Sequence, residues 1–302
     1  MLEWKWEKNN KINLVKFVNK KAVELLSKLP ENRFDLVQSK KGRRKLVETI
    51  YNCLLSKNIR YAYEIYQPKE TEQLIRTPSQ ILSSLGEGTC LDLALLFCGL
   101  CLGCDLLPLL IIIDGHALAA VSLNHNCQNG GWNDSGRREL QLFRKENDEG
   151  DLLAGEEKLK KLQQLIDDEA YIAIECTGFA HTDSFVNLKE PEEKGRESGF
   201  LDFNRALDAG SEQLLNPRRP FHFAIDVALA HYGWGIEPLP LEIPNLTTES
   251  RQVQVRQNIQ NSENDNNIGV DAKGGATDGR FDVNQNIVNS KGSTTIGWRG
   301  DA

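Results

Sequence analysis

The chain has 302 residues, of which 40% are hydrophobic and 26% charged, and its formal net charge is −7. This composition is ordinary for a globular protein, and the length suits one domain of about 200–250 residues plus an appendage. No apolar run approaches the roughly 18 residues that span a bilayer, which argues against a membrane protein, and the acidic balance argues against a nucleic-acid partner.

Residues 1–59 are predicted to form an N-terminal helical cap. Residues 1–60 contain fifteen Lys and Arg against six Asp and Glu. Apolar residues at helical spacing predict one helix from Phe17 to Leu29, ended by Pro30, and a second over Arg43–Leu55. The basic face lacks the aromatic interleaving of a nucleic-acid site, so we interpret it as solvated surface.

The stretch from Gly88 to His116 is predicted to carry the chemistry. Cys90 directly precedes an apolar helical run, Leu91–Leu102, and the β-branched run Leu106–Ile113 predicts a strand. In the first turn of that helix, unpaired N–H groups and the helix dipole would stabilise a Cys90 thiolate. After a turn at Asp114–Gly115, His116 starts a second strand, which would pack beside the helix and bring the imidazole to the sulfur.

A third strand is expected to supply an acid. The apolar run Tyr171–Cys176 is interrupted by Glu175, and Cys, His and a carboxylate are the nucleophile, base and orienting group of thiol catalysis. Asp226, in a predicted strand or strand–helix junction over Phe221–Leu229, is an alternative acid. A further helix is expected over Phe200–Leu215.

Between His116 and Glu175 lies a polar, acidic insertion, residues 124–168. It is predicted to contain a helix over Glu156–Ile166. Loops beside an active site often set access and specificity, although a solvated decoration is an equal alternative. Trp132 is the residue of this insertion that we would test first.

Several of these motifs resemble bacterial transglutaminase-like cysteine-protease domains. The resemblance rests on QLIRTPSQIL, GTCLDLALLF, DGHALAAV and FAIDVALAHYGWGIEPLP. It covers roughly Arg60 to Leu241 of a predicted core domain, residues 60–244. It implies an α+β papain/transglutaminase-like core, in which a helix carrying Cys90 packs on an antiparallel sheet carrying His116 and the acid, and a protein or peptide substrate. It also makes Gln73, with Gln80 as the alternative, a candidate donor to the oxyanion. The acid here is Glu175 where such cores usually have Asp.

Residues 245–302 are predicted to be a linker and an Asn/Gly-rich tail with two repeats. Residues 255–270 align without gaps on residues 283–298, with eight of sixteen positions identical. Each copy predicts a strand, a polar turn and a strand, and two such units need to stack on each other or on copies in other chains. The layout resembles the two pseudo-repeats of the fungal HET-s prion-forming domain and bacterial amyloid signalling motifs. That resemblance implies self-assembly or a sensor partner; a disordered duplicated linker is the alternative.

The seven cysteines indicate reduced thiols rather than a disulfide framework. Cys101 and Cys104 form a CxxC pair without the second pair that a zinc site needs, so we expect no metal and no cofactor. The first thirty residues contain no signal-peptide core, from which we expect a cytoplasmic protein. The sequence therefore predicts a cysteine peptidase, with transglutaminase or amidase acyl transfer, or a non-catalytic binding module, as alternatives.

Overall fold

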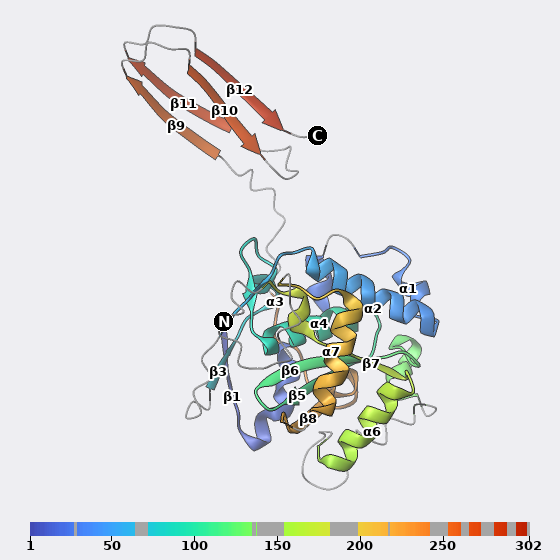
Figure 1. Cartoon of the computed structure of the whole chain (residues 1–302). Helices are drawn as coiled ribbons and strands as arrows, with labels where there is room; N and C mark the ends of the chain where they lie inside the picture. The colour runs from blue at the N-terminus through green and yellow to red at the C-terminus, as the bar shows by residue number, and fades with distance from the viewer. Residues whose placement is uncertain are drawn as a thin grey trace. The chain divides into compact units, whose positions relative to one another are not determined.

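The computed structural model describes residues 1–26, 29–63, 72–134, 137, 154–181, 199–216 and 218–241, and in the C-terminal part residues 253–260, 266–272, 281–288 and 294–300. The chain divides into two compact units, Met1–Ile243 and Pro244–Ala302. Residues 1–59 therefore belong to the same unit as the predicted core. This larger unit mixes helices and strands, which confirms the α+β class (Figure 1).

A four-stranded antiparallel sheet forms the centre of the larger unit. Its order is β7-β6-β5-β8, and its strands are β5 (Pro108–Ile113), β6 (His116–Ser122), β7 (Tyr171–Ile174) and β8 (Phe221–Asp226). β5 and β6 form a hairpin in which Ile113 pairs with His116. The predicted strands and the turn between them are confirmed. Because His116 is the first residue of its strand, its side chain lies at the end of the sheet.

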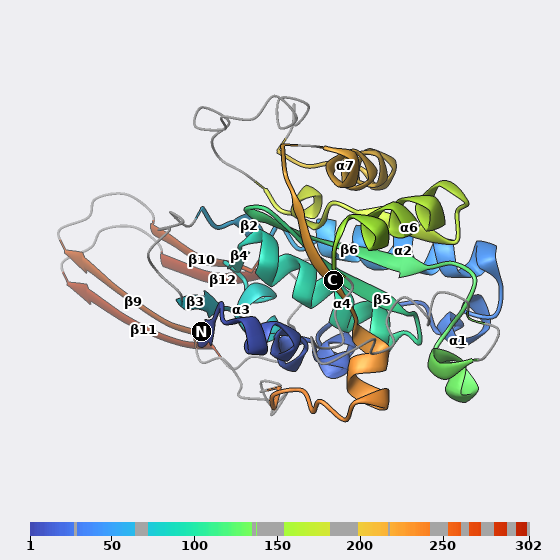
Figure 2. The same cartoon turned by 90° about the horizontal axis from the view of Figure 1, so that it is seen from below.

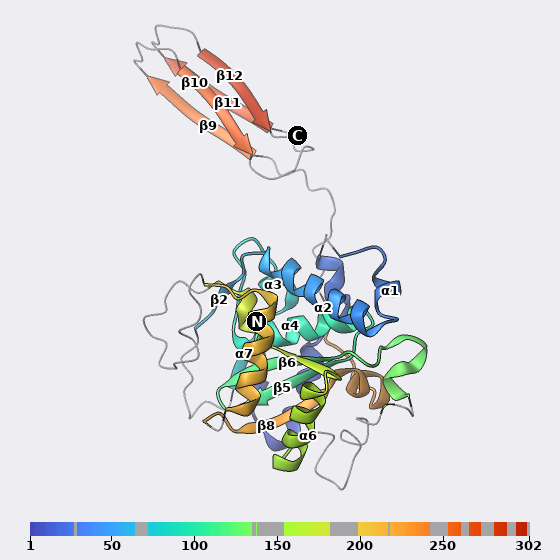
Figure 3. The same ribbon diagram turned by 45° about the vertical axis from the view of Figure 1, so that its right-hand side comes forward.

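Each face of the sheet buries a separate apolar cluster, as expected for strands whose side chains alternate. Leu110 and Ile112 contribute to the cluster on the α4 (Cys90–Gly103) side, whereas Leu109 and Ile111 contribute to the cluster on the other side. The opposite face is covered by α6 (Glu156–Asp167) and α7 (Phe203–Leu215). Figure 2 shows α6 and α7 on one side of β5 and β6 and α4 on the other, and in Figure 3 α7 runs across the strands beside α6.

α4 is surrounded by protein on all sides. Its residues from Leu91 to Leu102 are all buried. The predicted helix over Leu91–Leu102 is confirmed and is one residue longer at each end. A helix that is apolar all round is typical of a protein core. The buried helix α4 therefore holds the backbone of its first residue, Cys90, in place.

The predicted helix from Phe17 to Leu29 is wrong. The chain forms two 3-10 helices, η1 (Lys8–Phe17) and η2 (Lys20–Leu25), and residues 27–28 lie outside the described residues. Between the two, Asn19 is extended; its side chain accepts from the Lys21 N–H and donates to the Leu239 carbonyl at 2.8 Å. Its backbone lies so close to α4 that a methyl group at Gly99 would be 2.8 Å from the Asn19 carbonyl oxygen. These contacts of Asn19 with Leu239 and Gly99 set an extended backbone here, although the apolar spacing predicts an α-helix.

The N-terminal region also contains a strand that the sequence analysis missed. β1 (Leu2–Lys5) pairs antiparallel with β3 (Glu72–Ile75). The second predicted helix is confirmed as α2 (Lys40–Leu55), which starts three residues early because the Ser39 side chain accepts from the Gly42 N–H. The remaining short elements before the nucleophile are α1 (Arg33–Leu36), β2 (Arg60–Tyr61), α3 (Pro78–Ile81) and β4 (Glu87–Gly88).

In the second half of the core, the helices over Glu156–Ile166 and Phe200–Leu215 are confirmed as α6 and α7. The strand predicted over Tyr171–Cys176 ends at Ile174, because Glu175 caps a 3-10 turn, η4 (Cys176–Phe179). The strand over Phe221–Leu229 ends at Asp226 and is followed by a π-helical turn, η6 (Leu229–Gly233). The insertion is described in part, by η3 (Gln128–Asn133) and α6.

The C-terminal unit contains β9 (Val253–Gln260), β10 (Asn266–Ala272), β11 (Phe281–Val288) and β12 (Thr294–Gly300). β9 pairs with β11 and β10 with β12, both in parallel. Every pair joins residues 28 positions apart, for example Ile259 with Ile287 and Gly269 with Gly297. This offset is the one by which the two sequence repeats align, so the repeats stack on each other within the chain.

Among the described residues, no helix combines the length and apolarity required to cross a bilayer.

Candidate active site

Cys90 is the first residue of α4, and a capping box fixes the start of this helix. The Thr89 hydroxyl accepts from the Asp92 N–H at 3.3 Å, and the Asp92 carboxylate accepts from the Thr89 N–H at 3.0 Å. Such reciprocal bonds satisfy two of the donors that a helix start leaves open. Asp92 thus stabilises the helix start. Cys90 itself is half-buried, so its thiol is accessible while its backbone is held.

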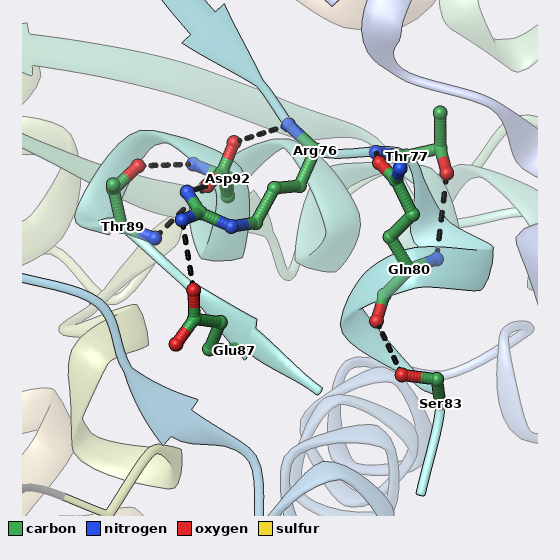
Figure 4. Close-up of polar contacts among 7 residues, drawn as sticks. All are labelled: Arg76, Thr77, Gln80, Ser83, Glu87, Thr89 and Asp92. Carbon is green, nitrogen blue, oxygen red and sulfur yellow. Dashed lines mark hydrogen bonds and ion pairs between the residues drawn. The ribbon is translucent and has the colours of Figure 1, made fainter. Parts of the chain in front are cut away.

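Arg76 ties the preceding segment to this helix start (Figure 4). The Arg76 guanidinium contacts the Asp92 carboxylate and the Glu87 carboxylate, each at 3.0 Å. The backbone N–H of Arg76 also donates to the Asp92 carboxylate, at 2.9 Å. Burial raises the pKa of Asp92, and the hydrogen bonds from Thr89 and Arg76 act in the opposite direction. The arginine therefore compensates a buried negative charge two residues from Cys90.

The two glutamines proposed as oxyanion donors differ in their surroundings. Gln80 belongs to a capping box at the start of α3, where its side-chain oxygen accepts from the Thr77 N–H at 3.0 Å (Figure 4). Gln73, in β3, accepts at 3.0 Å from the indole N–H of Trp6. Neither side chain has a hydrogen bond to Cys90, His116 or Glu175 among the described contacts. In both glutamines the side-chain oxygen accepts a hydrogen bond from a residue outside this group.

His116 and Glu175 lie in direct contact. The Nε2 atom of His116 is 2.7 Å from the Oε2 atom of Glu175, and the two side chains are 9% and 2% exposed. The His116 side chain also forms a hydrogen bond with Cys90. Because Nε2 faces the carboxylate, Nδ1 is the nitrogen that remains for the sulfur. The structure thus brings together the three residues that the sequence analysis selected from three separate segments.

The electrostatics of this group favour a charged imidazole. Burial by itself lowers the pKa of His116, but the charges of Glu175 and Cys90 and hydrogen bonds to both raise it to about 10. A neighbouring anion favours the protonated imidazole, and the imidazolium in turn favours the thiolate. The arrangement therefore places a protonated imidazole beside the Cys90 sulfur at neutral pH.

Glu175 is held by more donors than the sequence analysis identified. Its Oε1 atom accepts from the N–H and the hydroxyl of Thr177, at 2.9 and 2.7 Å. Its Oε2 atom accepts from His116 and from the side-chain amide of Gln213 in α7. Thr177 follows directly from the cap that Glu175 forms. Gln213 is distant in sequence, and no motif marked it.

The other candidate residues are placed away from this group. Asp226 pairs with Arg137, and both side chains are fully buried. Arg137 also donates to the Tyr171 hydroxyl at 3.1 Å and to the Trp132 carbonyl at 2.9 Å. Asp226 therefore anchors the insertion to the sheet and is not the catalytic acid. The Trp132 ring packs 6.0 Å from the ring of Tyr232, which makes it part of the same structural contact.

Five of the other six cysteines have a pKa that burial raises. Burial raises the pKa of the four fully buried thiols and leaves them uncharged; these are Cys98, Cys101, Cys104 and Cys176. Burial also raises the pKa of the half-buried Cys127 to about 12. In the described part of the chain, no three His, Cys, Asp or Glu side chains gather closely enough to hold a metal ion.

Comparisons of the chain with protein-family models, with curated proteins and with solved structures give no match.

Proposed function

We propose that this protein is a cysteine peptidase with a papain/transglutaminase-like core. The observation that supports this most is the continuous contact from Cys90 through His116 to Glu175. It joins the start of a buried helix, the start of a central strand and a cap at the end of the neighbouring strand. These positions are the ones that the resemblance to transglutaminase-like proteases implies.

In the proposed mechanism, the Cys90 thiolate attacks an amide carbonyl carbon. The C–N bond breaks as His116 gives its proton to the leaving amine, and an acyl-enzyme remains. His116 then takes a proton from water, which attacks the thioester and releases the acid. Glu175 keeps the imidazole oriented and stabilises its positive charge. The N–H of Cys90, and an amide N–H of Gln73, are the proposed donors to the oxyanion.

Two alternatives share parts of this mechanism. An amine in place of water at the second step would make the protein a transglutaminase, with every earlier step unchanged. A non-catalytic binding module would keep the fold without an activated thiol. The second alternative is distinguished by the reactivity of Cys90.

The test is the pH dependence of Cys90 alkylation by iodoacetamide, in the wild type and in His116→Ala, with labelled sites mapped by mass spectrometry. An imidazolium that persists to the His116 pKa of about 10 should keep the wild-type rate nearly constant from about pH 6 to 9. Without the imidazole, the rate should rise through about pH 8.5, as for an ordinary thiol. Cys53, also half-buried, is the internal reference. If Cys90 follows Cys53 at every pH, the peptidase proposal fails.

We further propose that the C-terminal repeats regulate the enzyme through assembly, either with copies of this chain or with a sensor protein that carries a similar repeat. The parallel, in-register pairing of β9 with β11 and β10 with β12 supports this, because such a stack leaves unpaired backbone groups at both ends. A strand of a further repeat would pair with those backbone groups.

Deleting residues 251–302 should leave the larger unit folded and abolish concentration-dependent assembly. Sedimentation velocity over a hundredfold range of concentration would measure assembly, and the thermal midpoint of the deleted chain would report on the core. If the full-length and the deleted chain sediment alike and react alike at Cys90, the proposal that the tail regulates the enzyme is wrong.

A further inference from the structure

α7 contributes a side chain to the catalytic group that the proposed mechanism does not require. The Nε2 amide of Gln213 donates to Glu175 Oε2, the same oxygen that contacts His116. The Oε1 atom of Gln213 accepts from Arg219 at 3.3 Å. This second bond fixes which end of the carboxamide faces Glu175, since an arginine can only donate.

The position of Gln213 follows from a close contact between α7 and β7. Ala206, Gly210 and Gln213 lie at i, i+4 and i+7 on one face of the helix. The Ala206 carbonyl accepts from the Glu175 N–H at 3.0 Å. A methyl group at Gly210 would lie 2.8 Å from the carbonyl carbon of Ala173, so only glycine allows this approach. The helix is thereby docked on the strand that leads to Glu175, with Gln213 within reach of its carboxylate.

We infer that Gln213 is a positioning residue, which holds the Glu175 carboxylate in the orientation that aligns His116 with Cys90. The inference rests on the proposed thiol chemistry. Thr177 holds one carboxylate oxygen and Gln213 the other, so the group cannot rotate away from the imidazole.

The charged and titratable groups around this carboxylate come from several elements. His116 faces it from β6, the Cys176 thiol lies next to it in η4, and Arg219 acts through Gln213. Cys90 faces the other side of the imidazole. The Gln213 contact, by contrast, can be removed without changing a charge of the catalytic group.

The test is Gln213→Met, which keeps the side-chain length and removes the amide donor. Loss of a donor disfavours the charged carboxylate and loosens its orientation. The acid limb of the Cys90 alkylation profile should therefore move to higher pH by about one unit, a decrease of about tenfold in rate on that limb. The imidazole N–H proton resonance of His116 should also shift, because its acceptor is less ordered.

Gln163→Met is the matched control. Gln163, in α6, donates to the Leu214 carbonyl of α7 at 2.7 Å, so the variant removes a partly buried glutamine hydrogen bond to the helix that carries Gln213 without touching Glu175. Its alkylation profile should match the wild type, and thermal melting should show both variants folded. A wild-type profile in Gln213→Met, with wild-type Cys90 still activated, overturns the positioning role alone. An unactivated wild-type Cys90 overturns the proposed function.

Discussion

Glu175→Gln should slow the reaction of Cys90 with iodoacetamide at pH 6 by about a hundredfold, because an unpaired thiol with a pKa of about 8.5 is almost wholly protonated there. Turnover of any amide substrate should fall by about 10³–10⁴, the effect of losing the orienting carboxylate of a triad. A carboxamide has only one accepting end, whereas Glu175 accepts at both oxygens. An amide nitrogen facing His116 forces the imidazole to accept at Nε2 and to carry its proton on Nδ1, where it cannot take a proton from sulfur.

Glu87→Gln is the control for this experiment. Glu87 is also an acid close to the start of α4, but it is 44% exposed and contacts Arg76. Its variant should keep the rate of Cys90 alkylation within about twofold, because Arg76 keeps its contacts with Asp92 when Glu87 is replaced. Equal rates for Glu175→Gln and the wild type across pH 5–8, with folding confirmed, would contradict the orienting role of Glu175.

Arg137→Met should lower the free energy of unfolding by about 3–5 kcal/mol, the cost of leaving a buried charge without its partner. The Asp226 carboxylate is fully buried, and besides its contact with Arg137 it accepts from the Leu229 N–H at 2.9 Å. Burial by itself would lower the pKa of Arg137, but the charge of Asp226 raises it, so the guanidinium is charged at every pH of interest. Urea denaturation followed by circular dichroism measures the loss.

Two further variants separate the buried charge from other effects. Adding Asp226→Asn to Arg137→Met removes the uncompensated carboxylate and should restore part of the lost stability. Lys160→Met breaks an exposed pair with Glu156, whose side chains are 70% and 79% exposed, and should change stability by less than about 0.5 kcal/mol. A loss no greater in Arg137→Met than in Lys160→Met would contradict the anchoring role of the pair.

The nucleophile segment was predictable because its signals are local. A glycine and a threonine precede Cys90, a twelve-residue apolar run follows it, and a β-branched strand and a tight turn deliver His116. Helix and strand periods and cap chemistry are enough to place these elements. The tail was predictable for another reason, since the repeat itself specifies which residues pair.

Other parts were not predictable because they depend on tertiary contacts. The extended backbone at Asn19 is set by its close approach to Gly99, and apolar spacing carries no sign of that. Gln213 reaches Glu175 only because α7 docks on β7 through Gly210. Arg137 lies in a polar, acidic stretch that reads as surface, yet its guanidinium is fully buried. In each case the partner is dozens of residues away.

The distribution of the thiols gives the molecule a built-in folding reporter. Four cysteines are shielded inside the core, and Cys53, Cys90 and Cys127 are the ones within reach of a reagent. Intact mass therefore distinguishes chains labelled at three cysteines or fewer, whose core is closed, from chains with more labels, whose core has unfolded. The rate of labelling at Cys90 separately measures the reactivity of the site. One reaction mixture thus separates a variant whose chemistry has changed from one whose core no longer stays closed.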